Sequence, residues 1–246
     1  MAKHIPSIKR VFITVIPFGI IVCAGCAPKI RDPLPDVPRV VLWAWEEPED
    51  LRWIDPHEVG VAFFAGSLRI DDDGAVFRPR LQPLRVPGGT SMIAVVRVVG
   101  MSTRAPLDRT AAAIADAARL PRVRAIQIDF DALASQRDFY AELVKAVRAK
   151  LPPRMPLLIT ALVSWCIGDR WLDRLAVDEA VPMYFRMGSE QGLRGIPLRE
   201  PLCQNSVGIS TDELRKVQLR HRLFLFHPRP WTSESLRAAL SEVQRW

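Results

Sequence analysis

The chain has 246 residues, of which 49% are hydrophobic and 25% are charged. This composition excludes an intrinsically disordered protein, because the apolar side chains are numerous enough to offset the chain entropy that folding removes. Four cysteines exclude a disulfide-rich scaffold, and a single apolar run near spanning length excludes a multi-pass membrane protein. The formal net charge of +7 is compatible with a nucleic-acid-binding protein, but residues 1–25 contribute part of that charge.

Residues 1–25 have the layout of a secretory signal peptide. A basic region is followed by the apolar run 11–22 and by Cys23-Ala24-Gly25-Cys26. This ending resembles a bacterial lipobox, in which the cysteine after Ala-Gly is lipidated. The resemblance implies lipidation of Cys26 and an exported lipoprotein that is anchored in a membrane of the cell envelope, facing the periplasm or the outside. An uncleaved membrane anchor is the alternative.

Removal of residues 1–25 would delete three basic and no acidic residues, so the formal net charge would fall from +7 to +4. The rest of the chain has no Lys/Arg-rich cluster of the nucleic-acid-binding kind. We therefore expect no nucleic-acid partner. Residues 26–39 contain four prolines and predict an extended tether between the lipid and a folded domain over 40–246.

Residues 40–246 alternate between strand-like and helix-like segments. Strands are expected at 40–46, 59–70, 92–99, 123–131, 157–166, 180–187, 207–210 and 223–227. Helices are expected at 108–120, 135–151, 169–175 and 233–246. This alternation predicts an α/β fold, a small and somewhat irregular (β/α)8 TIM-like barrel in a single domain, whose first two units lack clear helices. A doubly wound open sheet is the alternative.

The expected strand 123–131 carries polar residues on one face. Its Ile and Phe side chains should pack on the outer helices, whereas Gln127, Asp129 and Asp131 should point into the barrel. Polar side chains in the interior are costly unless they are paired or functional. Arg97, in the neighbouring strand, is placed to pair with Asp129, either as a structural ion pair or as part of a site.

Further polar and aromatic residues fall near the C-terminal ends of the strands, where this fold carries its active sites. We expect Asp131, Asp129 and Glu46 to be the catalytic carboxylates. The expected substrate-binding residues are Arg97, Trp45, Trp165, Tyr184, Arg186, His227 and Trp231. Tryptophan faces beside carboxylates are typical of a sugar-binding cleft. Alternatively, the tryptophans belong to the core and His227 to a turn.

Other types of site lack a motif. No His/Cys/Asp cluster has the spacing of metal ligands, no Gly-x-Gly-x-x-Gly follows a strand, and no Gly-x-Ser-x-Gly elbow is present. We therefore expect no metal, no cofactor and no hydrolase triad. The stretch Ser210-Thr211-Asp212-Glu213 matches a capping box at a helix start, although its carboxylates are also candidates for the site.

Two cysteines, Cys166 and Cys203, remain after the signal segment and Cys26 are set aside. Both should lie at the C-terminal mouth of the barrel. An exported chain meets an oxidising compartment, where nearby thiols tend to pair. We expect a disulfide between them that pins the loop 187–204 across the cleft; two free thiols are the alternative.

Several motifs together carry a resemblance to a family. They are Leu42-Trp43-Ala44-Trp45-Glu46, Gln127-Ile128-Asp129-Phe130-Asp131-Ala132, Thr160-Ala161-Leu162, Ser164-Trp165-Cys166, Val181 to Gly188, and Gly208 to Glu213. The chain resembles, over nearly all of 40–232, the bacterial domain-of-unknown-function family 3142. The resemblance implies an exported protein with a glycosidase-like barrel and no assigned activity.

The motif at 127–132 is also similar to the Asp-x-x-Asp-x-Asp-x-Glu stretch of family-eighteen chitinases. Asp129 and Asp131 match its last two aspartates. The catalytic glutamate would fall at Leu133, and Ala125 replaces the first aspartate. The proton donor of that family is therefore missing, and its mechanism cannot be carried over.

These features predict a cell-envelope lipoprotein with a glycoside-hydrolase-like barrel that acts on or binds carbohydrate. In an enzyme, Asp131 would be the general acid or the nucleophile, with Glu46 as its partner. Arg97 and Arg186 would bind carboxylates or an acidic sugar. The alternative is a non-catalytic glycan-binding or scaffold lipoprotein. The sequence identifies no protein partner.

Overall fold

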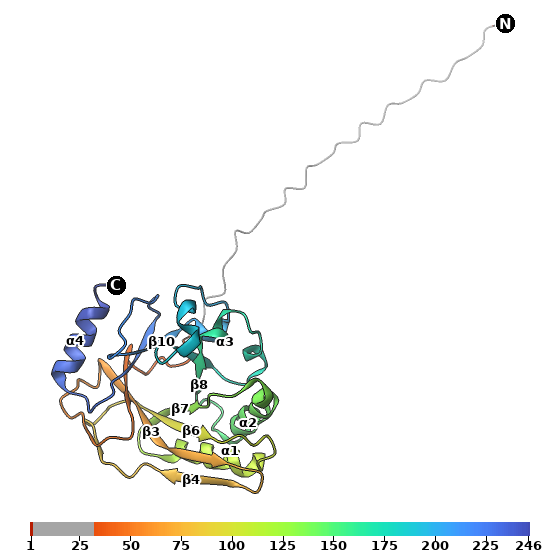
Figure 1. Ribbon diagram of the computed structural model, residues 1–246, viewed down its shortest axis with the longest axis horizontal. Helices are drawn as coiled ribbons and strands as arrows, with labels where there is room; N and C mark the ends of the chain where they lie inside the picture. Colours follow the sequence, from red (N-terminus) through yellow and green to blue (C-terminus); the bar gives the residue numbers. More distant parts are fainter. Residues whose placement is uncertain (2–31) are drawn as a thin grey trace.

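The computed structural model describes Met1 and residues 32–246. Eight parallel strands form a closed barrel, because β1 pairs with both β11 and β3 (Figure 1). The barrel strands are β1 (Val40–Ala44), β3 (Val59–Ile70), β6 (Met92–Val99), β7 (Val123–Asp129), β8 (Leu157–Leu162), β9 (Glu179–Met183), β10 (Ser206–Ser210) and β11 (Arg222–Phe226). The predicted TIM-like barrel is confirmed, and the open doubly wound sheet is wrong. The predicted signal segment and Cys26 lie outside the described residues.

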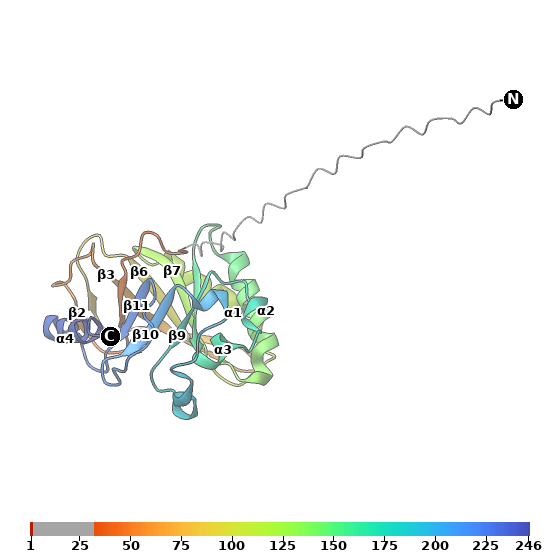
Figure 2. The same cartoon turned by 90° about the horizontal axis from the view of Figure 1, so that it is seen from above.

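The α-helices cover the barrel unevenly. They are α1 (Leu107–Ala115), α2 (Arg137–Lys150), α3 (Val163–Ile167) and α4 (Ser233–Val243). Short 3-10 helices span Asp116–Arg119, Ala134–Gln136, Leu172–Arg174, Gly188–Leu193 and Pro201–Cys203. Both views place α1 and α2 together on one side of the barrel and α4 on the other (Figures 1 and 2). The α-helical part of the expected helix 108–120 ends at Ala115 and is followed by the 3-10 turn Asp116–Arg119.

Short strands replace helices in the first two units, where the sequence predicted an irregularity. They are β2 (Glu49–Asp50), β4 (Ala75–Pro79) and β5 (Leu84–Arg85). β3 runs beyond the barrel and pairs with β4 in antiparallel fashion, with a bulge between Phe64 and Gly66 in its register with β6. A side chain at Gly66 would approach the carbonyl oxygen of Arg78 to 2.5 Å, so the hairpin requires glycine there.

Alternation along β7 separates two apolar cores, as predicted. Ile126 and Ile128 belong to the outer core, under the helices, whereas Ala125 belongs to the inner core within the barrel. The inner core also contains the Trp43 indole, which is 3% exposed. A side chain on Gly208 would come within 2.7 Å of that ring, so the glycine makes room for a tryptophan inside a small barrel.

Residues 32–39 close the N-terminal end of the barrel. Leu34 and Val37 are 2% and 6% exposed and pack in the inner core. The buried Arg222 donates to the carbonyl oxygens of Leu34 at 2.8 Å and of Val37 at 3.1 Å, and it pairs with Asp32 at 3.1 Å. The predicted tether over 26–39 is therefore wrong for residues 32–39. Its prolines shape a plug that is anchored by two apolar side chains and one arginine.

Candidate functional site

A cavity of about 400 Å³ opens among the C-terminal ends of the strands. The residues that line it come from β1, β6, β7, β8, β9 and β11 and from the segments that follow these strands. They are Trp43, Trp45, Arg97, Asp129, Asp131, Thr160, Leu162, Met183, Phe185, Arg186, Met187, Gly188 and Phe226. Ligand sites of TIM-like barrels lie at this end, so the cavity is the candidate site.

Asp129 is the most enclosed carboxylate of the cavity. Its side chain is 15% exposed and accepts a 2.8 Å hydrogen bond from the Thr160 hydroxyl. The Arg97 Nε atom lies 3.8 Å from the Asp129 Oδ2 atom, in the register that pairs these residues across β6 and β7. Because the Arg97 side chain is 44% exposed, this pair belongs to the open cavity and is not a buried structural ion pair.

The two aspartates of the cavity bind protons more tightly than free aspartates do. The pKa of Asp129 is raised to about 6, chiefly by burial and also by the charge of Asp131, against the lowering effects of the Thr160 hydrogen bond and the Arg97 charge. Burial also raises the pKa of Asp131, and Arg97 opposes that rise. Asp129 can therefore hold or release a proton close to neutral pH, as a general acid or base requires.

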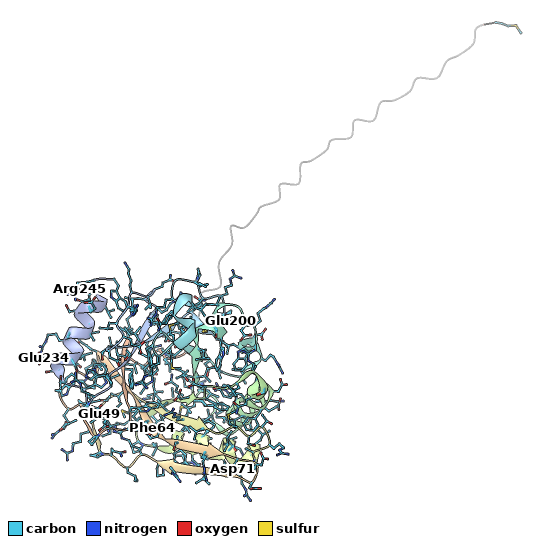
Figure 3. The ribbon with its side chains drawn as sticks, viewed as in Figure 1. Glu49, Phe64, Asp71, Glu200, Glu234 and Arg245 are labelled. Carbon is cyan, nitrogen blue, oxygen red and sulfur yellow. A yellow bond between two sulfur atoms is a disulfide. The ribbon has the colours of Figure 1, made fainter. Side chains whose placement is uncertain are left out.

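Aromatic rings form the floor and the walls of the cavity. The Trp43 indole N–H donates to Gln127 Oε1 at 2.9 Å, which satisfies a polar group deep in the barrel. The Phe185 and Phe226 rings are stacked, with centroids 5.6 Å apart. The Trp45 ring lies 5.2 Å from that of Phe64, which is labelled in Figure 3. Flat apolar faces thus stand beside the carboxylates.

Arg186 reaches the cavity through an unusual backbone conformation. Its φ angle is +51°, in the left-handed region that non-glycine residues seldom adopt. Its backbone N–H donates to both carboxylate oxygens of Glu213 at 3.1 Å, and its guanidinium lies 5.2 Å from the centroid of the Phe226 ring. Glu213 therefore fixes the segment that presents Arg186. The predicted capping box is wrong, because a turn follows β10 and residues 211–221 contain no helix.

Five of the predicted site residues line the cavity, namely Arg97, Asp129, Asp131, Trp45 and Arg186. Tyr184 does not, although it was predicted to bind substrate. β9 ends at Met183, and alternation turns Val181, Met183 and Phe185 inward, so Tyr184 points outward into the outer core. Arg186 lines the cavity from a residue in the left-handed conformation, beyond the segment that alternates.

Four further predicted site residues do not line the cavity. Trp165 and Trp231 are both 3% exposed and belong to the outer core. The Trp165 ring packs against Trp171, and the Trp231 indole N–H donates to the Trp43 carbonyl oxygen. His227 contacts Thr211 and the Trp231 ring and does not line the cavity. Glu46 is exposed and also lies outside the lining. Nearness to a strand end does not settle the direction of a side chain.

Eight lining residues were not among the predicted site residues, namely Trp43, Thr160, Leu162, Met183, Phe185, Met187, Gly188 and Phe226. Met183 and Phe185 share the inward face of this segment, opposite Tyr184, which was predicted to bind substrate. The prediction of Tyr184 therefore turned the wrong face of this segment toward the cavity. The apolar Val181 offered the signal, because it occupies the inner core and shares a face with both residues.

Two other carboxylates have a raised pKa without lining the cavity. Burial raises the pKa of Glu49 to about 7, and this residue, labelled in Figure 3, accepts the Trp231 backbone N–H at 3.0 Å. Burial also raises the pKa of Glu179 to about 7, at the N-terminal end of the barrel near Arg222. Both lie outside the cavity, so a raised pKa alone does not mark a residue of the candidate site here.

Cys166 and Cys203 form a disulfide, with Cα atoms 5.9 Å apart. The carbonyl oxygen of Cys166 also accepts the backbone N–H groups of Arg199 at 2.8 Å and Glu200 at 3.1 Å. The loop 187–204 begins at the mouth, where Met187 and Gly188 line the cavity. The disulfide thus ties the far end of this loop to α3.

Within Met1 and residues 32–246, no group of three or more His, Cys, Asp and Glu side chains is placed to hold a metal ion, and no helix is long and apolar enough to cross a membrane. No family model, curated protein or solved structure matches the chain. The functional argument therefore depends on the chemistry of the cavity.

Proposed function

We propose that the cavity at the barrel mouth binds a carbohydrate and that the protein hydrolyses a glycosidic bond there. One observation carries the proposal: Asp129, whose pKa is about 6, lines a cavity together with Asp131 and the aromatic side chains of Trp45, Phe185 and Phe226. Aromatic faces bind the apolar faces of pyranose rings, and a pair of carboxyl groups performs the acid and base steps of glycoside hydrolysis.

In this proposal Asp129 replaces Glu46 as the partner of Asp131. Protonated Asp129 gives its proton to the glycosidic oxygen, and the leaving sugar departs as an alcohol. Ionised Asp131 takes a proton from a water molecule, whose oxygen bonds to the anomeric carbon. The more enclosed of the two carboxyl groups keeps its proton more readily, which supports this division of roles.

Two arginines point to an acidic sugar as the substrate class. Arg97 and Arg186 both line the cavity, and Arg97 is 44% exposed beside Asp129. An exposed guanidinium can form a charge-assisted pair with the carboxylate of a uronic acid. We therefore propose acidic oligosaccharides as the first substrates to try.

The test is the release of reducing ends from a panel of neutral and acidic oligosaccharides. The wild type should cleave one class, and Asp129→Asn and Asp131→Asn should each lower the rate by at least about a hundredfold, as loss of a general acid or base does. Asp173→Asn is the matched control, because Asp173 is exposed and lies outside the cavity. A rate for Asp129→Asn equal to that of the control would contradict the proposal.

A second candidate is non-catalytic glycan binding. The observation that favours it is Leu133, which is 49% exposed at the position where the chitinase-like motif would place its glutamate. Saturable binding of an oligosaccharide without release of reducing ends, in wild type and variants alike, would support binding over hydrolysis.

We also propose that the protein is a lipoprotein of the cell envelope, with Cys26 lipidated. The ordered plug begins at Asp32, six residues after Cys26, and six residues span at most about 20 Å. Such an anchor would hold the N-terminal end of the barrel near the membrane and direct the cavity away from it. Labelling with a palmitate analogue should mark the wild type and not Cys26→Ser; equal labelling of both would contradict lipidation at this residue.

A further inference from the structure

A second cavity, of about 510 Å³, lies on the other side of the segment that follows β9. It is lined by Tyr184, Arg194, Gly195, Ile196, Pro197, Leu198, Lys216, Val217, Gln218, Leu219, Arg220 and Trp246. Tyr184 lines this cavity, whereas its neighbours Met183 and Phe185 line the first one. The backbone of 183–185 therefore separates two cavities with different linings.

The charged side chains that line the second cavity are cations. They are Arg194, Lys216 and Arg220, and none of the described lining residues has an acidic side chain. Arg194 Nη1 and Arg220 Nε are buried without a hydrogen-bond partner. The other contacts of these guanidinium groups are long: Arg194 Nη2 lies 3.7 Å from Glu213, and Arg220 Nη2 lies 3.3 Å from Gln218. Buried donors without partners are costly, and an acceptor from a ligand would satisfy them.

The electrostatics of this cavity favour an added negative charge. Burial lowers the pKa of Arg194 and the nearby charge of Arg215 lowers it as well, whereas Glu213 and Tyr184 act in the opposite sense. Burial raises the pKa of the Tyr184 hydroxyl, while the charges of Arg220 and Arg194 lower it. An anion between the two guanidinium groups would relieve the repulsion among the cations and could also accept a hydrogen bond from the Tyr184 hydroxyl.

The remaining lining is apolar, with Ile196, Leu198, Val217, Leu219 and Trp246. The volume is within the range of small-molecule sites and exceeds what a lone phosphate ion would fill. We propose that this cavity is a second binding site for a soluble ligand that carries a phosphate or carboxylate group on a partly apolar body. The assignment is independent of the proposed hydrolytic function.

Isothermal titration calorimetry with phenyl phosphate and with inorganic phosphate tests the site. Phenyl phosphate should bind saturably and more tightly than inorganic phosphate. Arg220→Gln and Lys216→Gln should each weaken its binding by at least about tenfold, as loss of a charge-assisted contact does. Arg237→Gln makes the same charge change on the exposed face of α4 and should leave the affinity unchanged. Lys216 is exposed, so its variant keeps the test valid if Arg220→Gln fails to fold.

Three calorimetric results would overturn the proposal. They are the absence of saturable phenyl phosphate binding, equal affinities of Lys216→Gln and Arg237→Gln for phenyl phosphate, and equal affinities of the wild type for phenyl phosphate and inorganic phosphate. Sedimentation with phosphatidylglycerol vesicles separates a soluble ligand from a lipid headgroup. Vesicle binding that Lys216→Gln abolishes and Arg237→Gln preserves would assign the cavity to a lipid surface and refute the soluble ligand.

Discussion

The Thr160 hydroxyl donates a 2.8 Å hydrogen bond to Asp129, and this contact joins the C-terminal ends of β8 and β7 inside the cavity. The nearest cation, Arg97, lies 3.8 Å from the other Asp129 oxygen. One neutral donor and one distant cation do not compensate for the burial of the carboxylate. This imbalance explains why the pKa of Asp129 rises to about 6, and it leads to a pH-dependent stability.

The free energy of unfolding should fall between about pH 4 and pH 6 because of Asp129. In this interval the unfolded chain has released the Asp129 proton while the folded protein keeps it, so stability decreases as pH rises. A pKa of about 6 in place of the ordinary 3.8 corresponds to about 3 kcal/mol. Urea unfolding of the wild type and of Asp129→Asn at pH 4 and pH 7 measures the effect.

Comparing the wild type with Asp129→Asn separates the effect of Asp129 titration on stability from the effects of the other carboxylates. Glu49 and Glu179 also have a raised pKa and titrate in the same sense, but both are present in wild type and variant. Asp129→Asn should therefore gain stability relative to the wild type as pH rises from 4 to 7. A constant difference between the two proteins over this interval would show that Asp129 titrates normally.

Substitution of Arg222 by methionine should release the N-terminal plug. Arg222 is 1% exposed and binds Asp32 together with the carbonyl oxygens of Leu34, Val37 and Pro38. Removing one partner of a buried network costs about 3–5 kcal/mol. Thermal and urea unfolding should show this loss for Arg222→Met, whereas Arg237→Met, on the exposed face of α4, should change stability little. Equal stabilities of the two variants would mean that the plug is not held by Arg222.

Loss of the disulfide should destabilise the domain. The Cys166–Cys203 bond closes a loop with a sequence separation of 37, for which the chain-entropy model gives about 4 kcal/mol. The double variant Cys166→Ala, Cys203→Ala should lose stability by this amount, and reduction of the wild type should have a similar effect. Wild type that unfolds identically with and without reductant, with the bond shown intact beforehand by mass spectrometry, would contradict this prediction.

Regular strands allowed the best predictions from sequence. In β7, polar residues alternate with Ile126 and Ile128, so the inward direction of Asp129 and the pairing with Arg97 followed from the period of two. After Phe185, two residues beyond the end of β9, this period no longer applies. The left-handed conformation of Arg186 depends on Glu213, which is 27 residues away in the chain, and no local pattern encodes that contact.

Tertiary packing also decided where the aromatic residues and the prolines belong. Trp45 and Trp231 look alike in the sequence, yet Trp231 is buried because α4 begins just after it and its N–H groups bind Glu49 and Trp43. The prolines of 32–39 predicted a tether, but Leu34 among them reaches the inner core. Both errors arose because a distant surface determined the position of a short segment.

Trp45 provides the most direct test of carbohydrate binding in the cavity, which both proposed functions require. The affinity of the wild type for its best oligosaccharide should be compared with those of Trp45→Ala and Trp53→Ala by calorimetry. Trp45 lines the cavity, whereas Trp53 is 38% exposed and lies outside it. Trp45→Ala should weaken binding by at least about tenfold, as loss of an aromatic contact residue does, and Trp53→Ala should not. Equal affinities of the two variants, or a wild type that binds no oligosaccharide, would contradict the account.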